Sequence, residues 1–424
     1  MKNIVKMSLA TAMLMGMSSV TAQAEGIDLV DNVKVKGEIR PRYEMSDAGG
    51  SSVNANALTN RLRVGVSAHL GGTDWLSGYA EMTDVRALND NYNDKNDANG
   101  IELNQVVVDP EQTRLTQAYL NMKFGETNFK VGRQVINLDG QRFIGAVGWR
   151  QMFQTYDAFT LTNKSIKGLD LFASYVTEIN RVFDQDVEAG NFAGQRDTRT
   201  LLLNASYKVM PELKVTAYSY MIGEGTAGGG SDTHGISLTG KTKVSDSLSL
   251  NYALEYAVQD DPTMENSGNP AKETKDASYY NLALGMNMSG FLAGVNYEVL
   301  SGDGGGDETA FATPLATGHK FNGWADKFLV TPTAGLEDMS IYVGYKSKKF
   351  GLAKVIYHDF KSEVGSTDYG TEVDALYKRG IPGVKNLSGL IKFANYDADA
   401  NAPTGLNVDS TKFWAMLTYK FSSK

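Results

Sequence analysis

Short segments in which apolar and polar residues alternate recur along most of the chain, and this period of two is the feature that most limits the possible fold. The clearest example is Leu248–Tyr256, in which Leu, Leu, Tyr, Leu and Tyr occupy every second position. Successive side chains of a β-strand point to opposite faces, so each such segment has one apolar and one polar face. The same period recurs in further segments: 280–286, 291–299 and 341–345. The sequence therefore predicts an all-β protein.

The segments number roughly 18 between Val33 and Phe421, and the connections between them alternate in length. The short connections are 71–74, 125–128, 210–211, 245–247, 289–290 and 347–349. The long ones include 88–111, 183–196, 260–277 and 302–335. This alternation is typical of a transmembrane antiparallel up-and-down β-barrel with periplasmic termini, because its periplasmic turns are short and its external loops are long. The alternative, a soluble β-sandwich, does not predict it.

The first 24 residues have the layout of a secretory signal peptide. Lys2 and Lys6 precede an apolar stretch over 7–17, and small residues follow up to Ala24. We expect cleavage after Ala24, which leaves a barrel domain over 25–424. An uncleaved amphipathic anchor is the alternative, although the apolar stretch is too short to span a bilayer as a helix. The expected location is the bacterial cell outer membrane.

Composition excludes several kinds of site. The chain has no cysteine, which removes disulfides, thiolate metal ligands and cysteine nucleophiles. The four histidines are scattered without metal-ligand spacing, so we expect no metal and no cofactor. The segment 90–100 is rich in Asp and Asn but lacks the ligand spacing of an EF-hand. Outer-membrane lipid is the expected neighbour, and no nucleic acid is expected.

Charge is divided between the loops and the wall. The formal net charge is −8. The proposed external loops carry about −19, which leaves about +11 for the remainder. If Val35, Ile39 and Tyr43 face lipid, the basic residues between them face the lumen, because an Arg or Lys at the lipid midplane costs about 2–4 kcal/mol. By this parity, the inward basic residues of the first two strands are Lys34, Lys36, Arg40, Arg42, Arg61 and Arg63.

These basic residues predict a pore that favours anions. The alternative is that the arginines pair with inward carboxylates, including Glu38, Glu44 and Glu81, and only support a hydrated wall. A cation-favouring reversal potential would contradict the prediction.

Several motifs resemble those of the alginate export family of outer-membrane barrels. The first group is Gly132-Arg133-Gln134, Asp139 to Gly145, Gly148 to Gln151 and Gln154 to Asp157. The second group is Ser301-Gly302-Asp303, Phe311, Thr313 to Thr317, His319, Phe321 to Phe328, His358-Asp359-Phe360 and Asp368 to Glu372. The resemblance implies a monomeric barrel of 18 strands that passes an anionic polysaccharide through an electropositive constriction; similar members serve small solutes.

The resemblance also implies site residues. Arg133, Arg142 and Arg150 look like pore-lining cations beside the loop that follows the fifth strand. The alternative is structural, with these arginines tying that loop to the wall through carboxylate pairs. The loop 302–335 is expected to fold inward as a constriction or lid. The residues that we expect to form it are His319, Trp324, Asp326, Lys327 and Phe328.

The sequence therefore predicts a passive outer-membrane channel, porin-like and not an enzyme, for anionic small solutes or an anionic polysaccharide. Two alternatives stay open. One is a structural or adhesive surface barrel with a plugged lumen. The other is a barrel hydrolase, against which the chain offers no Gly-x-Ser-x-Gly elbow and only the ordinary strand dipeptide His358-Asp359.

Overall fold

The computed structural model describes residues 23–24, 27–28, 30–49, 53–95, 101–188, 190–223, 230–261, 263, 276–303 and 310–423. The predicted signal peptide lies outside the described residues except for Gln23 and Ala24, so its cleavage stays a prediction. These two residues form β1 (Gln23–Ala24), which pairs with β2 (Ile27–Asp28).

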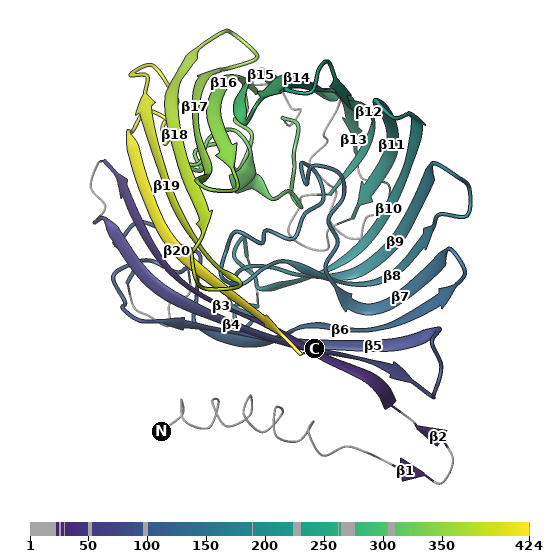
Figure 1. Ribbon diagram of the computed structural model, residues 1–424. Helices are drawn as coiled ribbons and strands as arrows, with labels where there is room; N and C mark the ends of the chain where they lie inside the picture. The colour runs from purple at the N-terminus through teal and green to yellow at the C-terminus, as the bar shows by residue number, and fades with distance from the viewer. Residues whose placement is uncertain are drawn as a thin grey trace.

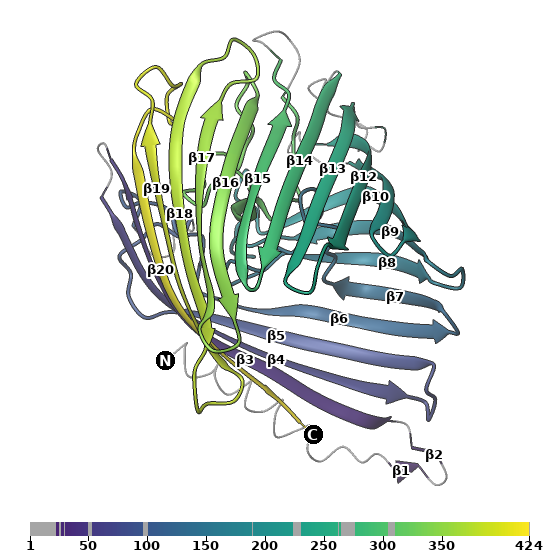
Figure 2. The same ribbon diagram turned by 45° about the horizontal axis from the view of Figure 1, so that its top comes forward.

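Eighteen antiparallel strands close into one barrel, in which each strand pairs with the next and β20 pairs with β3 (Figures 1 and 2). The fold class and the predicted strand number are thus confirmed. The strands are β3 (Val30–Ala48), β4 (Ala55–Leu70), β5 (Leu76–Ala87), β6 (Gln112–Phe124), β7 (Thr127–Gln134), β8 (Thr155–Asn163), β9 (Leu169–Asn180), β10 (Gln195–Met210), β11 (Leu213–Ile222), β12 (Ser231–Lys243), β13 (Leu248–Asp260), β14 (Ala277–Met288), β15 (Phe291–Leu300), β16 (Leu336–Ser347), β17 (Gly351–Lys361), β18 (Asp368–Gly380), β19 (Leu387–Ala398) and β20 (Ser410–Ser422).

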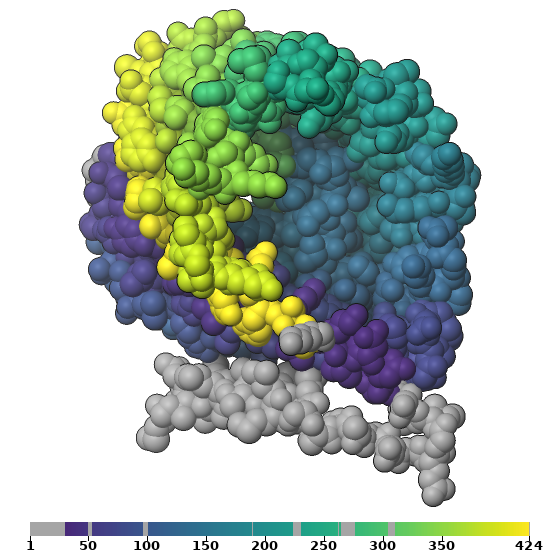
Figure 3. Space-filling model, viewed as in Figure 1, coloured from purple at the N-terminus to yellow at the C-terminus, as the bar shows by residue number. Residues whose placement is uncertain are grey.

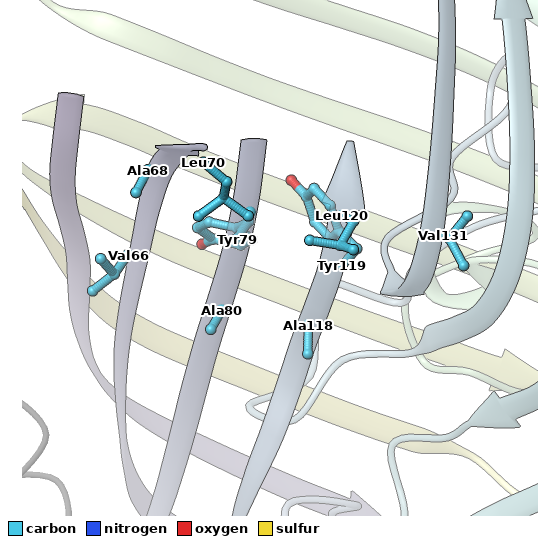
Figure 4. Close-up of a pocket in the computed structure, with 10 residues that line it drawn as sticks. Val66, Ala68, Leu70, Tyr79, Ala80, Ala118, Tyr119, Leu120 and Val131 are labelled. Atoms are coloured by element: carbon cyan, nitrogen blue, oxygen red, sulfur yellow. The ribbon is translucent and has the colours of Figure 1, made fainter. Parts of the chain in front are cut away.

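The outer face of the wall is apolar. Leu254 on β13 and Val343 on β16 are 44% and 62% exposed, whereas the two residues beside Leu254 in sequence are the small Ala253 and the charged Glu255. Figure 4 shows one such outer patch, where Ala68, Ala118 and Val131 come from separate strands of the wall. Apolar side chains on the outside of a closed sheet require a lipid environment, which is the reason for the two-residue period.

Aromatic pairs mark the end of the barrel that carries the short turns. Trp75 stacks on Phe124 with ring centroids 5.4 Å apart, and Phe291 lies 4.9 Å from Tyr345. All four residues lie at strand ends or in the adjoining turns, where an interfacial aromatic girdle belongs.

The predicted two-residue turn between β14 and β15 shows how the short connections work. Ser289 and Gly290 both have positive φ, at 52° and 95°. Two successive positive φ angles match the right-handed twist of the flanking strands. A Cβ on Gly290 would lie 2.6 Å from the carbonyl oxygen of Lys346, so this position requires glycine.

Two long connections run back into the barrel, where Figure 3 shows a hollow partly crossed by chain. We call residues 135–154, between β7 and β8, the first inner loop. Residues 301–335, between β15 and β16, are the second inner loop, described at 301–303 and 310–335; it includes the short helix η2 (Gly318–Lys320). Phe143 of the first and Phe311 of the second pack 5.9 Å apart inside the wall. No helix among the described residues is long and apolar enough to span a membrane.

Candidate functional site

The two inner loops are hydrogen-bonded to each other. Gly145 N donates to Leu315 O at 2.8 Å, Thr317 N donates to Gln141 O at 3.1 Å, and Val147 N donates to Thr317 Oγ1 at 3.1 Å. A Cβ on Gly145 would lie 2.3 Å from Thr317 Oγ1, so the close approach depends on glycine at this position. The loops therefore form one joined layer within the lumen.

Arg142 ties the first inner loop to the wall. Its guanidinium donates to Glu298 on β15 at 2.8 Å and to Asn322 of the second inner loop at 3.0 Å. The side chain is buried, and it lies 4.9 Å from the ring of Phe321. Burial opposes the ionisation of Arg142, but Glu298 and Tyr279 beside it together raise its pKa.

Three arginines of β3 and β4 hold the far end of the first inner loop by its carbonyl oxygens. Arg40 donates to Gly148 O at 3.1 Å, Arg42 to Trp149 O at 2.6 Å and Arg61 to Gln151 O at 3.1 Å. All three are buried.

Each of these two strands also provides a charge pair beside the loop. Arg42 forms an ion pair with Asp109 in the connection between β5 and β6, and Arg61 pairs with Glu38. The carboxylates offset buried positive charge that would otherwise be costly.

Asp326 is the main charged anchor of the second inner loop. Its carboxylate lies 2.7 Å from His319 Nδ1, 3.0 Å from Lys412 Nζ on β20 and 3.5 Å from Arg150 of the first inner loop. Arg150 also donates to Glu44 at 3.1 Å. Burial alone would raise the pKa of Asp326, but the surrounding His319, Lys412 and Arg150 hold it well below its usual range.

The rest of the second inner loop lies against β17, β18 and the connection between β19 and β20. Trp324 N donates to Asp374 at 3.2 Å, and Ala325 N donates to Glu372 at 2.8 Å. Phe328 packs against Phe360 at 4.5 Å. Lys327 donates to Gly405 O at 3.0 Å in the connection between β19 and β20.

His319 and Trp149 stack at the meeting point of the two loops, with ring centroids 4.6 Å apart. Lys392 Nζ of β19 lies 2.7 Å from His319 Nε2 and 3.7 Å from the ring centre of Trp324. The two contacts of His319 fit a neutral ring that donates from Nδ1 to Asp326 and accepts from Lys392 at Nε2. Burial lowers the pKa of His319 to about 3, which keeps this ring neutral.

Because the pKa of His319 is lowered in the folded state, acid destabilises the folded barrel. An unfolded His319 takes up a proton near pH 6.5, whereas the folded one does so only near pH 3, so stability should fall as the pH drops between these values. We expect the Tm of the detergent-solubilised barrel to fall less between pH 6.5 and 4 in His319→Gln than in the wild type. Parallel pH profiles of the two proteins would contradict this assignment.

The structure places one predicted site residue elsewhere. Arg133 was expected to line the pore. On β7, however, Gly132 pairs with the inward Tyr119, so Gly132 lies on the lumenal face of the strand. Arg133, like Val131 of the outer patch, therefore lies on the opposite, outer face. Its partners are Asp157 at 2.8 Å and Glu178 at 3.1 Å. Arg133 therefore belongs to an ion-pair cluster on the outer face, and its expected pore-lining role is wrong.

The other predicted basic residues lie on the lumenal side of the wall. Arg63 is 3.6 Å from Glu81 and lies over Phe153 of the first inner loop. Lys34 and Lys36 lie at the end with the short turns, where they line a hollow of ≈ 540 Å³ together with Lys130.

Lys130, Lys392 and Lys412 were missed by sequence analysis. A signal was present for Lys130 and Lys392, because Lys130 stands between Phe129 and Val131, and Lys392 between Ile391 and Phe393. Lys412 has an apolar neighbour, Phe413, on one side only. Inward lysines that form no ion pair with a carboxylate among the described residues include Lys34, Lys36, Lys130, Lys208, Lys241 and Lys354.

His358 does not form a catalytic triad with its neighbours. Its Nδ1 is 2.8 Å from Asp338, and its Nε2 is 3.7 Å from Asp374. Ser340 is its cross-strand neighbour but makes no hydrogen bond to it. In the part of the chain that the structure describes, no group of three or more His, Asp or Glu residues is placed to hold a metal ion.

A closed wall that is apolar outside and charged inside, with inward loops narrowing a hydrated lumen, defines a porin-like channel of the bacterial outer membrane. The chain belongs to the alginate export family, whose model matches residues 31–260. No curated protein matches the sequence.

Solved structures of similar fold include two proteins of Acinetobacter baumannii and one of Pseudomonas aeruginosa. OccAB2 is 17% identical with a TM-score of 0.67, covering 93% of this chain and 99% of its own. OccAB3 is 16% identical with a TM-score of 0.68, covering 92% and 100%. OpdL of P. aeruginosa is 14% identical with a TM-score of 0.66, covering 93% and 99%. At these identities the likeness shows the fold alone.

Proposed function

We propose that the protein is a passive, monomeric channel that favours anionic small solutes or an anionic polysaccharide. The basic residues on the lumenal side would raise the local concentration of anions, and weak contacts at several sites would still allow exit. The second inner loop, with His319, Trp324, Asp326, Lys327 and Phe328, would form the constriction. No hydrolytic activity is expected, because His358 lacks a hydrogen-bonded nucleophile.

The observation that carries this proposal is the difference between the lumenal arginines and lysines. Arg42, Arg61, Arg142 and Arg150 lie within ion-pair distance of carboxylates, so much of their charge is offset locally. The six inward lysines named above have no such carboxylate among the described residues. Their charge therefore acts on the lumen, mostly toward the end with the short turns.

The family and one structure of similar fold both support an anionic solute. The family takes its name from alginate export, and alginate is a polyanion. OpdK of P. aeruginosa, which has a TM-score of 0.67 and 12% identity to this chain, was solved with vanillate, which is also a carboxylate.

The test is ion selectivity in a planar bilayer under a KCl gradient. We expect the wild-type reversal potential to favour chloride, and the double variant Lys36→Gln, Lys130→Gln to shift it toward potassium, because two uncompensated lumenal charges are removed. Arg133→Gln is the matched control, since its guanidinium lies on the outer face, and it should leave the potential unchanged. A wild-type preference for potassium would overturn the proposal.

A further inference from the structure

A cavity of ≈ 280 Å³ lies inside the wall between the first inner loop and the strands β11 to β14. We propose that it binds a neutral, polyhydroxylated ring, such as one sugar residue of a passing solute. The proposal rests on the channel function argued above, but it does not depend on the preference for anions. The volume lies near the lower end of the range for small-molecule sites, which suits a single ring.

Aromatic rings from both inner loops and the wall line this cavity. Phe143 comes from the first inner loop, Phe321 from the second, Tyr220 from β11 and Tyr279 from β14. Phe143 and Tyr279 are 5.2 Å apart, edge to face. The negative face of an aromatic ring attracts the positively polarised C–H groups of a sugar ring, so these side chains provide a platform for its apolar side.

The side chain of Asn281 gives separate support for a ligand in this cavity. Its Oδ1 is buried and accepts no hydrogen bond among the described residues, although the side chain lines the cavity. A buried acceptor without a donor is costly. A solute hydroxyl in the cavity would donate to this oxygen and remove the cost.

The other polar groups match a hydroxylated ring, because hydroxyls both donate and accept. Ser237 and Thr239 of β12 line the cavity and make no side-chain hydrogen bond among the described residues. Asp139 and Glu255 offer carboxylate oxygens, of which Glu255 accepts from Tyr218 at 2.9 Å. Donors and acceptors thus stand together around the aromatic platform.

The charge balance of the cavity argues against an anionic ligand. Two cations line it, and each is already near a carboxylate: Arg142 lies 2.8 Å from Glu298, and Lys214 lies 3.9 Å from Asp139. Glu255 adds a further acidic group. No positive charge is left to hold an anion here, in contrast to the lysine-lined hollow at the end with the short turns.

The experiment measures current noise of single channels in symmetrical KCl with added maltose, and with polyethylene glycol of equal hydrodynamic size as the non-binding probe. We expect maltose, but not the polymer, to produce binding noise. Asn281→Leu should weaken maltose binding roughly tenfold, because the ring then loses a hydrogen bond in a desolvated site. Asn296→Leu is the matched control: Asn296 faces the lumen on β15 but does not line the cavity, so this variant should bind as the wild type does.

Equal responses to maltose and polymer, or an unchanged affinity in Asn281→Leu, would overturn the sugar site while leaving the channel in place. If the barrel does not conduct, the channel proposal fails. Calorimetry of maltose binding to the detergent-solubilised wild type and to both variants then tests the sugar site independently. Heat of binding that is lost only in Asn281→Leu supports it, and no heat in the wild type overturns it.

Discussion

Deleting residues 304–334 is expected to raise the single-channel conductance roughly twofold or more, because a constriction inside a pore controls its conduction. The part of this loop that the structure describes lies against the lumenal side of β18 and β20, through Ala325 to Glu372 and Asp326 to Lys412. It also holds the first inner loop through Thr317. Its loss should therefore open the lumen in two ways, and conductance at fixed KCl measures the result.

Removing residues 382–385 from the short turn between β18 and β19 is the control for this deletion. That turn lies at the other end of the two strands and contributes no residue to the inner loops. We expect the conductance of the 382–385 deletion variant to stay at the wild-type value. An unchanged conductance in the 304–334 deletion, in a protein that still forms a heat-modifiable barrel, would contradict the constriction.

The second large effect is expected from Arg142→Ala. Glu298 would lose its ion-pair partner inside the barrel, and such a loss at a buried site costs about 3–5 kcal/mol. The free energy of unfolding, measured by urea titration of the barrel in lipid, should fall by this amount. The noise of the open channel should rise, because the first inner loop also loses its contact with Asn322.

Two further variants show whether the loss of stability in Arg142→Ala comes from the unpaired charge of Glu298. Adding Glu298→Gln to Arg142→Ala should recover part of the loss, since it removes the uncompensated charge. Lys164→Ala breaks the exposed pair with Asp170, with side chains 61% and 59% exposed, and should change stability by less than about 1 kcal/mol. Equal losses in Arg142→Ala and Lys164→Ala would refute the structural role of Arg142.

The wall of the barrel could be predicted from sequence because a single physical rule governs it. Lipid on one side and water on the other force a period of two, and the strands β13 to β16 show it without interruption. The alternation of short and long connections follows from the same topology. This is why the number of strands and the turn at 289–290 agree with the structure, and why the turn predicted at 347–349 lies within one residue of the observed turn at 348–350.

The role of Arg133 was predicted wrongly because the family motif was used instead of the alternation of inward and outward residues along the strand. The alternation of Phe129, Val131 and Arg133 already assigns this arginine to the outer face, but its place in a family motif suggested the pore. The outward carboxylates Asp157 and Glu178 make the position tolerable by pairing with it.

The partners of the inner loops could not be predicted, for a different reason. Arg142 and Glu298 are 156 residues apart, and Asp326 and Lys412 are 86 apart. No local pattern relates residues across such distances. These pairs form only because both loops turn into a closed wall, so they depend on the three-dimensional fold and not on any segment alone.

Single-channel recording of the purified mature protein in a planar bilayer shows whether the lumen is a water-filled path or is plugged. We predict discrete stepwise increases of current as barrels insert, with a chloride preference under a KCl gradient. Insertion of heat-modifiable, folded barrels without any current steps would contradict a water-filled path and favour a structural or adhesive surface barrel.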